Sequence, residues 1–354
     1  MALPRSSYVK DGVEGVYHCF SRCVRRAFLC GFDPVTQRDF SHRKSWIVDR
    51  LQQLAATFAI EVCAYAVMDT HHHSILRTRP DIVATWSDTE VATRWLTLFP
   101  HHAGRKGGPP DDQQISALAL CSDRIAVLRI RLSSVSWFMG RLNEFIARAA
   151  NKEDNVKGRF WESRFKCLKL LDHAAIAACM VYVDLNPIRA GLSATPEDSN
   201  FTSIQLRIRA WYNETMTPAS VPREPNIPSD SPCGNLPQSA PSACWLCPIQ
   251  SDFQTRGILH MTPSEYFTLV DESGRMLRSD KRGAIDPTLA PILLRIGANP
   301  QAWLDTVSCF RSRFRLAAGL LSSLRSFADQ LGRRWFTGVT AARAAFASSL
   351  PQAG

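Results

Sequence analysis

The sequence predicts an α+β fold in which a four-stranded antiparallel sheet carries helices on one face, followed by a small, mostly helical C-terminal region. Two observations support this fold class. Up to about residue 200, apolar residues alternate between the period of a strand and that of a helix, in the order β-α-β-β-α-β. Beyond a proline-rich stretch, the spacing is helical. The order of the first part is that of the ferredoxin-like fold.

The first part of this pattern supplies three strands and one helix. Residues 17–23 alternate and are rich in aromatic and small apolar types, which predicts a strand. Apolar residues recur at helical spacing over residues 39–58, which predicts an amphipathic helix. Residues 61–68 and 71–77 then predict two strands joined by a two-residue turn that lacks the usual glycine.

An insertion at residues 79–125 separates these strands from the rest of the pattern. A helix is expected to begin after Ser87, which can form a capping box with Glu90. A loop with three glycines and two prolines follows at residues 101–114. We therefore expect the insertion to lie outside the sheet.

The pattern resumes with a helix over residues 135–150 and a fourth strand over residues 163–170. Asp172 is placed to cap a further helix, which carries Tyr182 and ends near Asn186. This helix completes the α+β part of the chain.

The chain divides into three parts. Residues 1–212 are expected to form the α+β domain, with residues 79–125 as its insertion. Residues 213–243 contain seven prolines and indicate a linker. Residues 244–354 are expected to form a helical accessory domain. Within it, residues 289–308 have the outline of a DNA-binding helix-turn-helix, although two core helices joined by a tight turn would give the same pattern.

The balance of charge favours a polyanionic partner. Lys and Arg number 42 against 32 Asp and Glu, which gives a net charge of +10. Nucleic acid would suit this charge, although a basic composition can also serve only to keep a protein in solution. With 45% hydrophobic and 21% charged residues, the chain is typical of a soluble globular protein.

The cysteines and the N-terminus indicate a cytoplasmic protein. The chain has 11 cysteines without the spacing of a disulfide framework, so reduced thiols are expected. Cys244 and Cys247 form a single CxxC, which is a weak indication of a metal site. We expect neither a signal peptide nor a membrane span, because no apolar segment has the required position or length.

Two distant segments contain residue types that suit one active site. In a strand, alternate side chains share a face, so His71 and His73 can bind one ion while His72 points away. In a helix, Tyr182 and Asn186 are neighbours one turn apart and can approach the same ion. A divalent ion beside a tyrosine suggests phosphoryl transfer at a phosphodiester, with the phenol as the nucleophile.

At these residues the chain resembles the single-tyrosine transposases of the HUH superfamily, which include the REP-associated tyrosine transposases. The resemblance covers about residues 10–215. Its segments are Tyr17-His18 with Ser21-Arg22, the hairpin at residues 65–77, the block at residues 159–166, and residues 182–192. The order and separation of these blocks also agree.

The resemblance implies an HUH catalytic domain that cleaves and rejoins single-stranded DNA near hairpins. Mg or Mn would be held by His71 and His73, with Asn186 as the third ligand. Tyr182 would form a 5′-phosphotyrosine and leave a free 3′-hydroxyl, without ATP or another nucleotide cofactor. The expected partner is palindromic DNA in the nucleoid, and the sequence leaves open whether a monomer or a homodimer acts on it.

Basic and aromatic residues form the expected DNA-binding surface. Bases can stack on aromatic rings beside a cationic track that follows the phosphates. The residues expected to contact DNA are Arg22, Arg25, Arg26, Arg159, Trp161, Arg164, Phe165 and Lys166.

The sequence departs from the family pattern at His72 and Thr70. Family members have a bulky apolar residue between the two histidines and commonly an asparagine before the first. A buried imidazole without a partner costs about 1–3 kcal/mol, so His72 needs either a partner or looser packing. These departures leave open a weakened, domesticated DNA-binding protein of the same fold.

Two rival functions involve related chemistry. An HUH replication initiator or relaxase would share the fold, but such proteins usually have differently ordered motifs or attached helicase domains. A two-histidine phosphoesterase needs two H-x-[ST] motifs, which occur here at His72-His73-Ser74 and His260-Met261-Thr262. The second motif lies beyond the proline-rich linker and outside any matching repeat.

Overall fold

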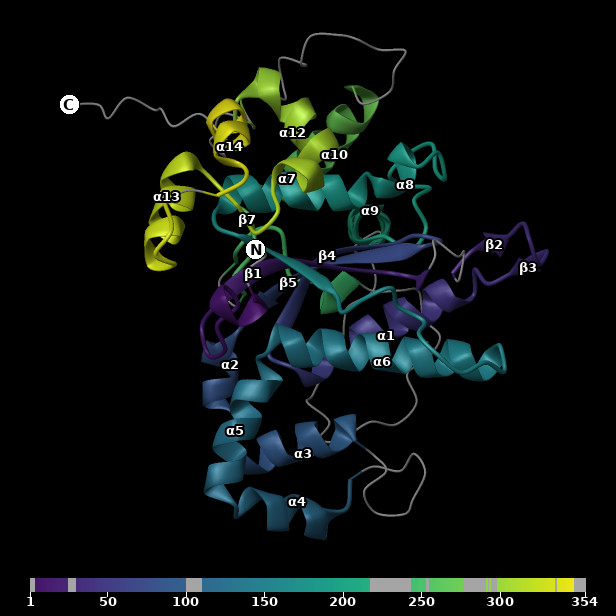
Figure 1. The fold of residues 1–354 in the computed structure, drawn as a ribbon, viewed down its shortest axis with the longest axis vertical. Coiled ribbons are helices and arrows are strands. Elements are labelled where there is room, and N and C mark those ends of the chain that lie inside the picture. Colours follow the sequence, from purple (N-terminus) through teal and green to yellow (C-terminus); the bar gives the residue numbers. More distant parts are fainter. Residues whose placement is uncertain are drawn as a thin grey trace.

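The computed structural model describes residues 4–24, 30–99, 110–216, 243–252, 255–276, 291, 293, 298–334 and 336–346. A central sheet runs through the molecule with helices on both sides of it (Figure 1). Arg25 and Arg26 lie outside the described residues, as does most of the proposed linker. No helix within the described ranges combines the length and the apolar character that a membrane crossing requires.

The sheet has five strands in the order β4-β5-β1-β6-β7. They are β1 (Gly15–Arg22), β4 (Ile60–Val67), β5 (His71–Thr78), β6 (Lys166–Leu170) and β7 (Ala317–Ala318). The first four are paired antiparallel, in the order expected of a ferredoxin-like sheet. The prediction of four strands is wrong by one, because β7 from the C-terminal region joins β6 in parallel.

Helices cover both faces of this sheet, whereas the sequence predicted helices on one face. Helices α1 (Arg43–Thr57) and α6 (Val135–Glu153) lie on one side of the sheet, and α7 (His173–Asp184) and α9 (Ser203–Met216) lie on the other (Figure 1). All residues of α7 after His173 are buried. A helix that is apolar on every side must be covered on every side, so α7 requires both the sheet and the C-terminal region.

The insertion forms a helical layer below the sheet in Figure 1. It contains α2 (Pro80–Thr85), α3 (Asp88–Leu98), α4 (Asp112–Ala119) and α5 (Ser122–Leu132). The predicted cap is present, because the Ser87 side chain accepts a hydrogen bond from the backbone N–H of Glu90 at 3.1 Å. The insertion is therefore an appendage to the sheet, as expected, with more helices than the sequence indicated.

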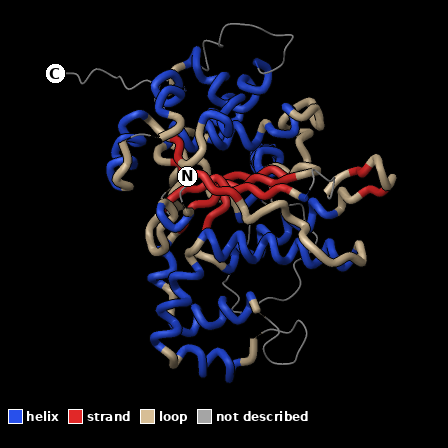
Figure 2. Tube along the Cα trace, in the orientation of Figure 1, coloured by secondary structure: helices blue, strands red, loops and turns tan. Residues whose placement is uncertain are grey.

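Short elements complete the N-terminal part. They are the 3-10 turn η1 (Arg5–Ser7) and a small separate hairpin of β2 (Phe32–Asp33) and β3 (Arg38–Asp39). Figure 2 shows this hairpin projecting from the end of the main sheet.

The C-terminal region packs onto the α+β domain and shares its hydrophobic core. It contains η3 (Ala243–Trp245), α10 (Pro263–Met276), α12 (Pro300–Arg313), α13 (Leu321–Gln330) and α14 (Val339–Ala345). Helices α10 and α12 both contact α7. Helix α12 would be the second helix of the proposed helix-turn-helix, but its Trp303, Val307 and Phe310 are buried. Most of the first helix of that motif lies outside the described residues.

A buried carboxylate joins the two parts of the chain. Asp184, at the end of α7, accepts hydrogen bonds from the Ser203 hydroxyl at 2.6 Å and the backbone N–H of Ile204 at 3.2 Å. Its second oxygen accepts a hydrogen bond from the Tyr266 hydroxyl of α10 at 2.5 Å. Burial raises the pKa of Asp184 to about 6. One carboxylate thus holds the ends of α7, α9 and α10 together.

We predict that Asp184→Ala lowers the free energy of unfolding by about 3 kcal/mol, because three buried donors lose their acceptor. Asp184→Asn should cost about 1 kcal/mol, since an amide of the same shape keeps an acceptor and supplies a donor toward Tyr266. Urea unfolding at pH 7 measures both values. Equal losses in the two variants would show that the hydrogen bonds of this carboxylate do not stabilise the fold.

Candidate active site

The three consecutive histidines divide between the two faces of the sheet. Strand β5 begins at His71, and its register pairs His71 with Arg22 and His73 with Phe20 of β1. The rings of His71 and His73 are neighbours, with centroids 5.0 Å apart. His72 points toward α6, where its Nε2 lies 3.3 Å from Oδ1 of Asn143. The alternation expected of a strand is therefore present.

His72 has one partner and one unpaired nitrogen. Its Nε2 contacts Asn143, which in turn donates a hydrogen bond to the Ser21 hydroxyl at 2.8 Å. Its Nδ1 is buried without a hydrogen-bond partner. Burial lowers the pKa of His72 to about 4, so the ring is neutral at pH 7. The cost of burying His72 is thus only partly offset by hydrogen bonding.

Tyr182 lies against the histidines of the opposite face. The centroid of its ring is 5.7 Å from that of His73, and the two rings meet edge to face. Helix α7 brings the tyrosine to this place because it packs over β4 and β5. The structure thus brings together His71, His73 and Tyr182, which the sequence had placed in one site from two distant segments.

His18 of β1 belongs to the same cluster, although the sequence analysis did not select it as a site residue. Its Nε2 lies 2.8 Å from Nδ1 of His73, and its ring centroid is 6.0 Å from that of Tyr182. The alternation of β1 could have indicated this residue. Phe20 is paired with His73, and His18, two residues earlier in the strand, lies on the same face of the sheet. His18 holds the His73 ring in a fixed orientation.

All three imidazoles on this face are neutral at pH 7. Burial lowers the pKa of His18 to about 3, with a further decrease from Arg311. Burial and the nearby Arg22 lower the pKa of His71 to about 4. Burial and the adjacent His18 lower the pKa of His73 well below its ordinary value. Neutral rings are the form that binds a metal ion.

The two histidines fit the divalent ion that the resemblance implies. Nε2 of His73 is buried and lacks a hydrogen-bond partner, and it carries a lone pair in the tautomer in which Nδ1–H of His73 donates to Nε2 of His18. Nδ1 of His71 lies 3.0 Å from the Thr70 hydroxyl, which can fix that ring as an outer ligand partner does. In the described part of the chain, no three His, Cys, Asp or Glu side chains are placed to hold a metal together. Further ligands would have to be oxygens of another kind.

Asn186 is the residue expected to supply such an oxygen. It is the first residue of α8 (Asn186–Arg189), directly after the end of α7. Its Nδ2 donates hydrogen bonds to the carbonyls of Tyr182 at 3.0 Å and Val183 at 3.4 Å. These bonds occupy the amide nitrogen, so the amide oxygen is the atom that could coordinate an ion. Its role as a ligand stays a prediction.

The phenol of Tyr182 is buried among cations. Only 6% of the residue is exposed. Burial raises the pKa of Tyr182, while Arg189 and Arg311 act in the opposite direction. The Arg189 guanidinium lies over the Tyr182 ring at 5.1 Å from its centroid. The two arginines therefore offset part of the cost of forming a buried phenolate.

Two further residues of the site come from α12 of the C-terminal region. Phe310 stacks on Tyr182, with ring centroids 5.9 Å apart and planes at 27°. Arg311 lies over the Phe20 ring, at 3.9 Å from its centroid. The sequence showed a basic stretch at residues 311–315, but nothing in it indicated contact with the tyrosine.

The residues expected to contact DNA differ in how they are placed. Arg159, Arg164 and Lys166 are exposed and available to a phosphate backbone. Phe165 is buried, and the Arg5 guanidinium covers its ring at 3.5 Å from the centroid. Phe165 therefore has no open ring face for a base, which corrects its expected role as a stacking platform.

Trp161 and Arg22 are also more enclosed than expected. The indole N–H of Trp161 donates a hydrogen bond to the Asn143 carbonyl at 2.9 Å, and its ring meets His72 edge to face at 5.4 Å. Arg22 ends β1 beside His71, and its Nε is buried without a hydrogen-bond partner. Arg22 thus belongs to the site with the histidines and not to an outer DNA surface.

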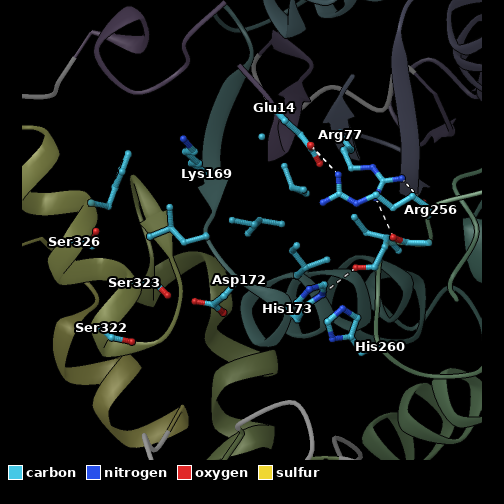
Figure 3. Close-up of a pocket in the computed structure, with 18 of the residues that line it drawn as sticks. Glu14, Arg77, Lys169, Asp172, His173, Arg256, His260, Ser322, Ser323 and Ser326 are labelled. Atoms are coloured by element: carbon cyan, nitrogen blue, oxygen red, sulfur yellow. Dashed lines mark hydrogen bonds and ion pairs between the residues drawn. The ribbon is translucent and has the colours of Figure 1, made fainter. Parts of the chain in front are cut away.

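A cavity of about 910 Å³ lies at the other end of the sheet (Figure 3). His173 and His260 contact each other on its wall, with ring centroids 3.8 Å apart and planes tilted by 37°, and serines of α13 line the opposite side. Neither His73 nor Tyr182 lines this cavity. Since His260 pairs with His173 and not with His73, the two H-x-[ST] motifs do not form the joint site of a two-histidine phosphoesterase.

Cys244 and Cys247 do not form a metal site with each other. Cys244 is exposed, whereas Cys247 is buried and its thiol lies 3.5 Å from a carboxylate oxygen of Glu61. Neither belongs to a metal-binding cluster among the described side chains.

Comparisons with known proteins give little support. No protein-family model matches the chain, and no curated protein matches it. Among solved structures, the chain is similar to a REP-associated tyrosine transposase bound to a REP hairpin, at 12% sequence identity and a TM-score of 0.32. The match covers 59% of this chain and 86% of that one. A likeness this weak carries no argument about function, which therefore has to come from the site itself.

We predict that His71→Ala and His73→Ala each weaken Mn²⁺ binding by about tenfold or more, because each removes a ligand. His72→Leu should leave it unchanged, since that side chain lies on the other face of the sheet. Titration of free Mn²⁺ by electron paramagnetic resonance at pH 7 measures all three. If His72→Leu loses Mn²⁺ binding while His73→Ala binds normally, the ion lies on the face of the sheet that carries His72, and the prediction is wrong.

Proposed function

We propose that this protein is a metal-dependent tyrosine transposase that cleaves and rejoins single-stranded DNA near hairpins through a 5′-phosphotyrosine. The observation that carries the proposal is the contact between the Tyr182 and His73 rings, 5.7 Å apart, with an unpaired imidazole nitrogen on His73. A phenol beside an imidazole nitrogen without a hydrogen-bond partner suits phosphodiester cleavage in which a tyrosine attacks and a metal ion assists.

The reaction is a transesterification. The Tyr182 oxygen forms a bond to the scissile phosphorus, and the bond from phosphorus to the 3′-oxygen breaks. The phenol loses one proton and the leaving 3′-oxygen gains one, so the reaction balances. A divalent ion bound by His71, His73 and Asn186 would supply polarisation of the phosphate. The phosphotyrosine retains the energy of the cleaved bond, so rejoining needs no ATP.

Side chains of this chain prepare the phenol for attack. Burial alone would oppose ionisation of Tyr182, but the cations Arg189 and Arg311 favour the phenolate. His18 and His73 stay neutral and contact the ring edge to face. The site therefore favours a tyrosine that becomes anionic only when the substrate and the ion are in place.

The exposed cations favour a single strand as the substrate. Arg159, Arg164 and Lys166 lie in and before β6, next to the strand that carries His18. They form a cationic track along which a flexible backbone can lie. A phosphate must bend into the enclosed site to reach Tyr182, which a free strand does more easily than a duplex.

We predict that Tyr182→Phe retains hairpin DNA with normal affinity but forms no covalent adduct, because the nucleophilic oxygen is gone. The measurement is a denaturing gel with a 5′-labelled and a 3′-labelled hairpin oligonucleotide in MnCl₂. The matched control is Tyr212→Phe, which changes an exposed tyrosine on α9. Normal adduct in Tyr182→Phe would remove this residue from the mechanism.

We also predict that the protein cuts a hairpin with a single-stranded flank at least tenfold faster than a blunt duplex of the same sequence, because only the flank can bend into the site. Initial rates on the two substrates at equal concentration test this. Equal rates would contradict the single-strand requirement. Retention of the hairpin by the wild type without any adduct would favour a DNA-binding protein that has lost cleavage.

A further inference from the structure

Arg311 reaches the candidate site from the last turn of α12. The helix departs from helical dihedral angles at Cys309, with φ −108° and ψ 15°. The next two residues both enter the site, because Phe310 stacks on Tyr182 and Arg311 lies over Phe20. The C-terminal region thus contributes one aromatic ring and one cation beside the proposed nucleophile.

Apart from the Phe20 ring, the Arg311 guanidinium has no partner among the described residues. No ion pair or hydrogen bond to it is found there, whereas Arg313, two residues later, lies 3.5 Å from a carboxylate oxygen of Asp305. Arg311 is only half-exposed, and a cation withdrawn from water without a counter-ion is costly. The guanidinium lies close to the site, because it covers the Phe20 ring, whose centroid is 5.7 Å from that of the His73 ring.

Other charges around this point are also mainly positive. Arg22 has a buried Nε without a hydrogen-bond partner, and Arg189 lies over the Tyr182 ring. Glu162 is the acidic group that acts on Arg311, and it does so without forming an ion pair with it in the described structure. Such an excess of cations suits an anion that arrives with the substrate.

We propose that Arg311 binds a non-bridging oxygen of the scissile phosphate, so that the C-terminal region supplies a catalytic residue to the active site. The inference rests on the proposed function for the identity of the substrate. A guanidinium presents a planar fork of N–H donors that matches a phosphate group. It remains charged throughout, so it donates hydrogen bonds and takes no proton.

This role gives Arg311 a place in the balanced reaction. As the Tyr182 oxygen bonds to phosphorus and the 3′-oxygen leaves, negative charge is held on the non-bridging oxygens. A fixed donor at that position stabilises the transition state more than it stabilises the uncleaved strand. The proposal also assigns a function to the region after residue 244, which would complete the site in addition to packing on α7.

The first test compares Arg311→Ala with Arg315→Ala, which removes an exposed cation four residues away. Arg311→Ala should lower kcat for hairpin cleavage by about 10²–10³, with little change in the Kd for the whole hairpin. Arg311→Lys should recover part of the loss, because it restores charge without the fork. Arg315→Ala should cleave normally, and melting temperatures confirm that each variant is folded. Faster cleavage by Arg311→Ala would overturn the proposal, because Arg311 would then obstruct the site.

The second test does not require cleavage. In the Tyr182→Phe background, the dinucleotide dTpdT and its uncharged methylphosphonate analogue are titrated by NMR with and without Arg311→Ala. We expect the charged dinucleotide to bind at least tenfold more tightly, and Arg311→Ala to abolish that preference. An unchanged preference in Arg311→Ala, or none in the parent, would overturn the assignment. If the wild type fails to cut any hairpin while this preference depends on Arg311, the proposed function fails and the phosphodiester site stands.

Discussion

The packing of α7 between the sheet and the C-terminal region is the constraint on which the rest of the structure depends. Every residue of this helix after His173 is buried, so it is stable only when both of its sides are covered. One side rests on β4 and β5, which places Tyr182 beside His73. The other side is covered by α10 and α12, and Asp184 ties the end of the helix to Tyr266.

The same burial determines the electrostatics of the site. Imidazoles that are withdrawn from water become neutral, which suits His71 and His73 as ligands. Burial also raises the pKa of Tyr182, and Arg189 and Arg311 oppose that effect. The site therefore combines neutral imidazoles with guanidinium groups that lack an ion-pair partner among the described residues, a composition suited to a phosphate and a metal ion.

Several features could be predicted because they depend on local sequence. Alternation in β5 determined that His72 points away from His71 and His73, and the structure places it against Asn143. The helix caps at Ser87 and Asp172 could be predicted because each is a local contact. In both, a side-chain oxygen accepts a hydrogen bond from the backbone N–H three residues later. The fifth strand was missed, because a pair of alanines at Ala317–Ala318 carries no periodic signal and becomes a strand only beside β6.

By itself, the sequence determined the order of the first four strands of the sheet and the selection of His71, His73 and Tyr182 as candidate site residues, because periodicity and side-chain chemistry are local properties. Only the tertiary structure decided that His18 supports His73, that Arg5 covers Phe165, and that Arg311 covers the Phe20 ring beside the site. These relations join residues far apart in the chain, and they arise from how buried surfaces match. A pattern read along one segment contains no information about which distant segment will cover it.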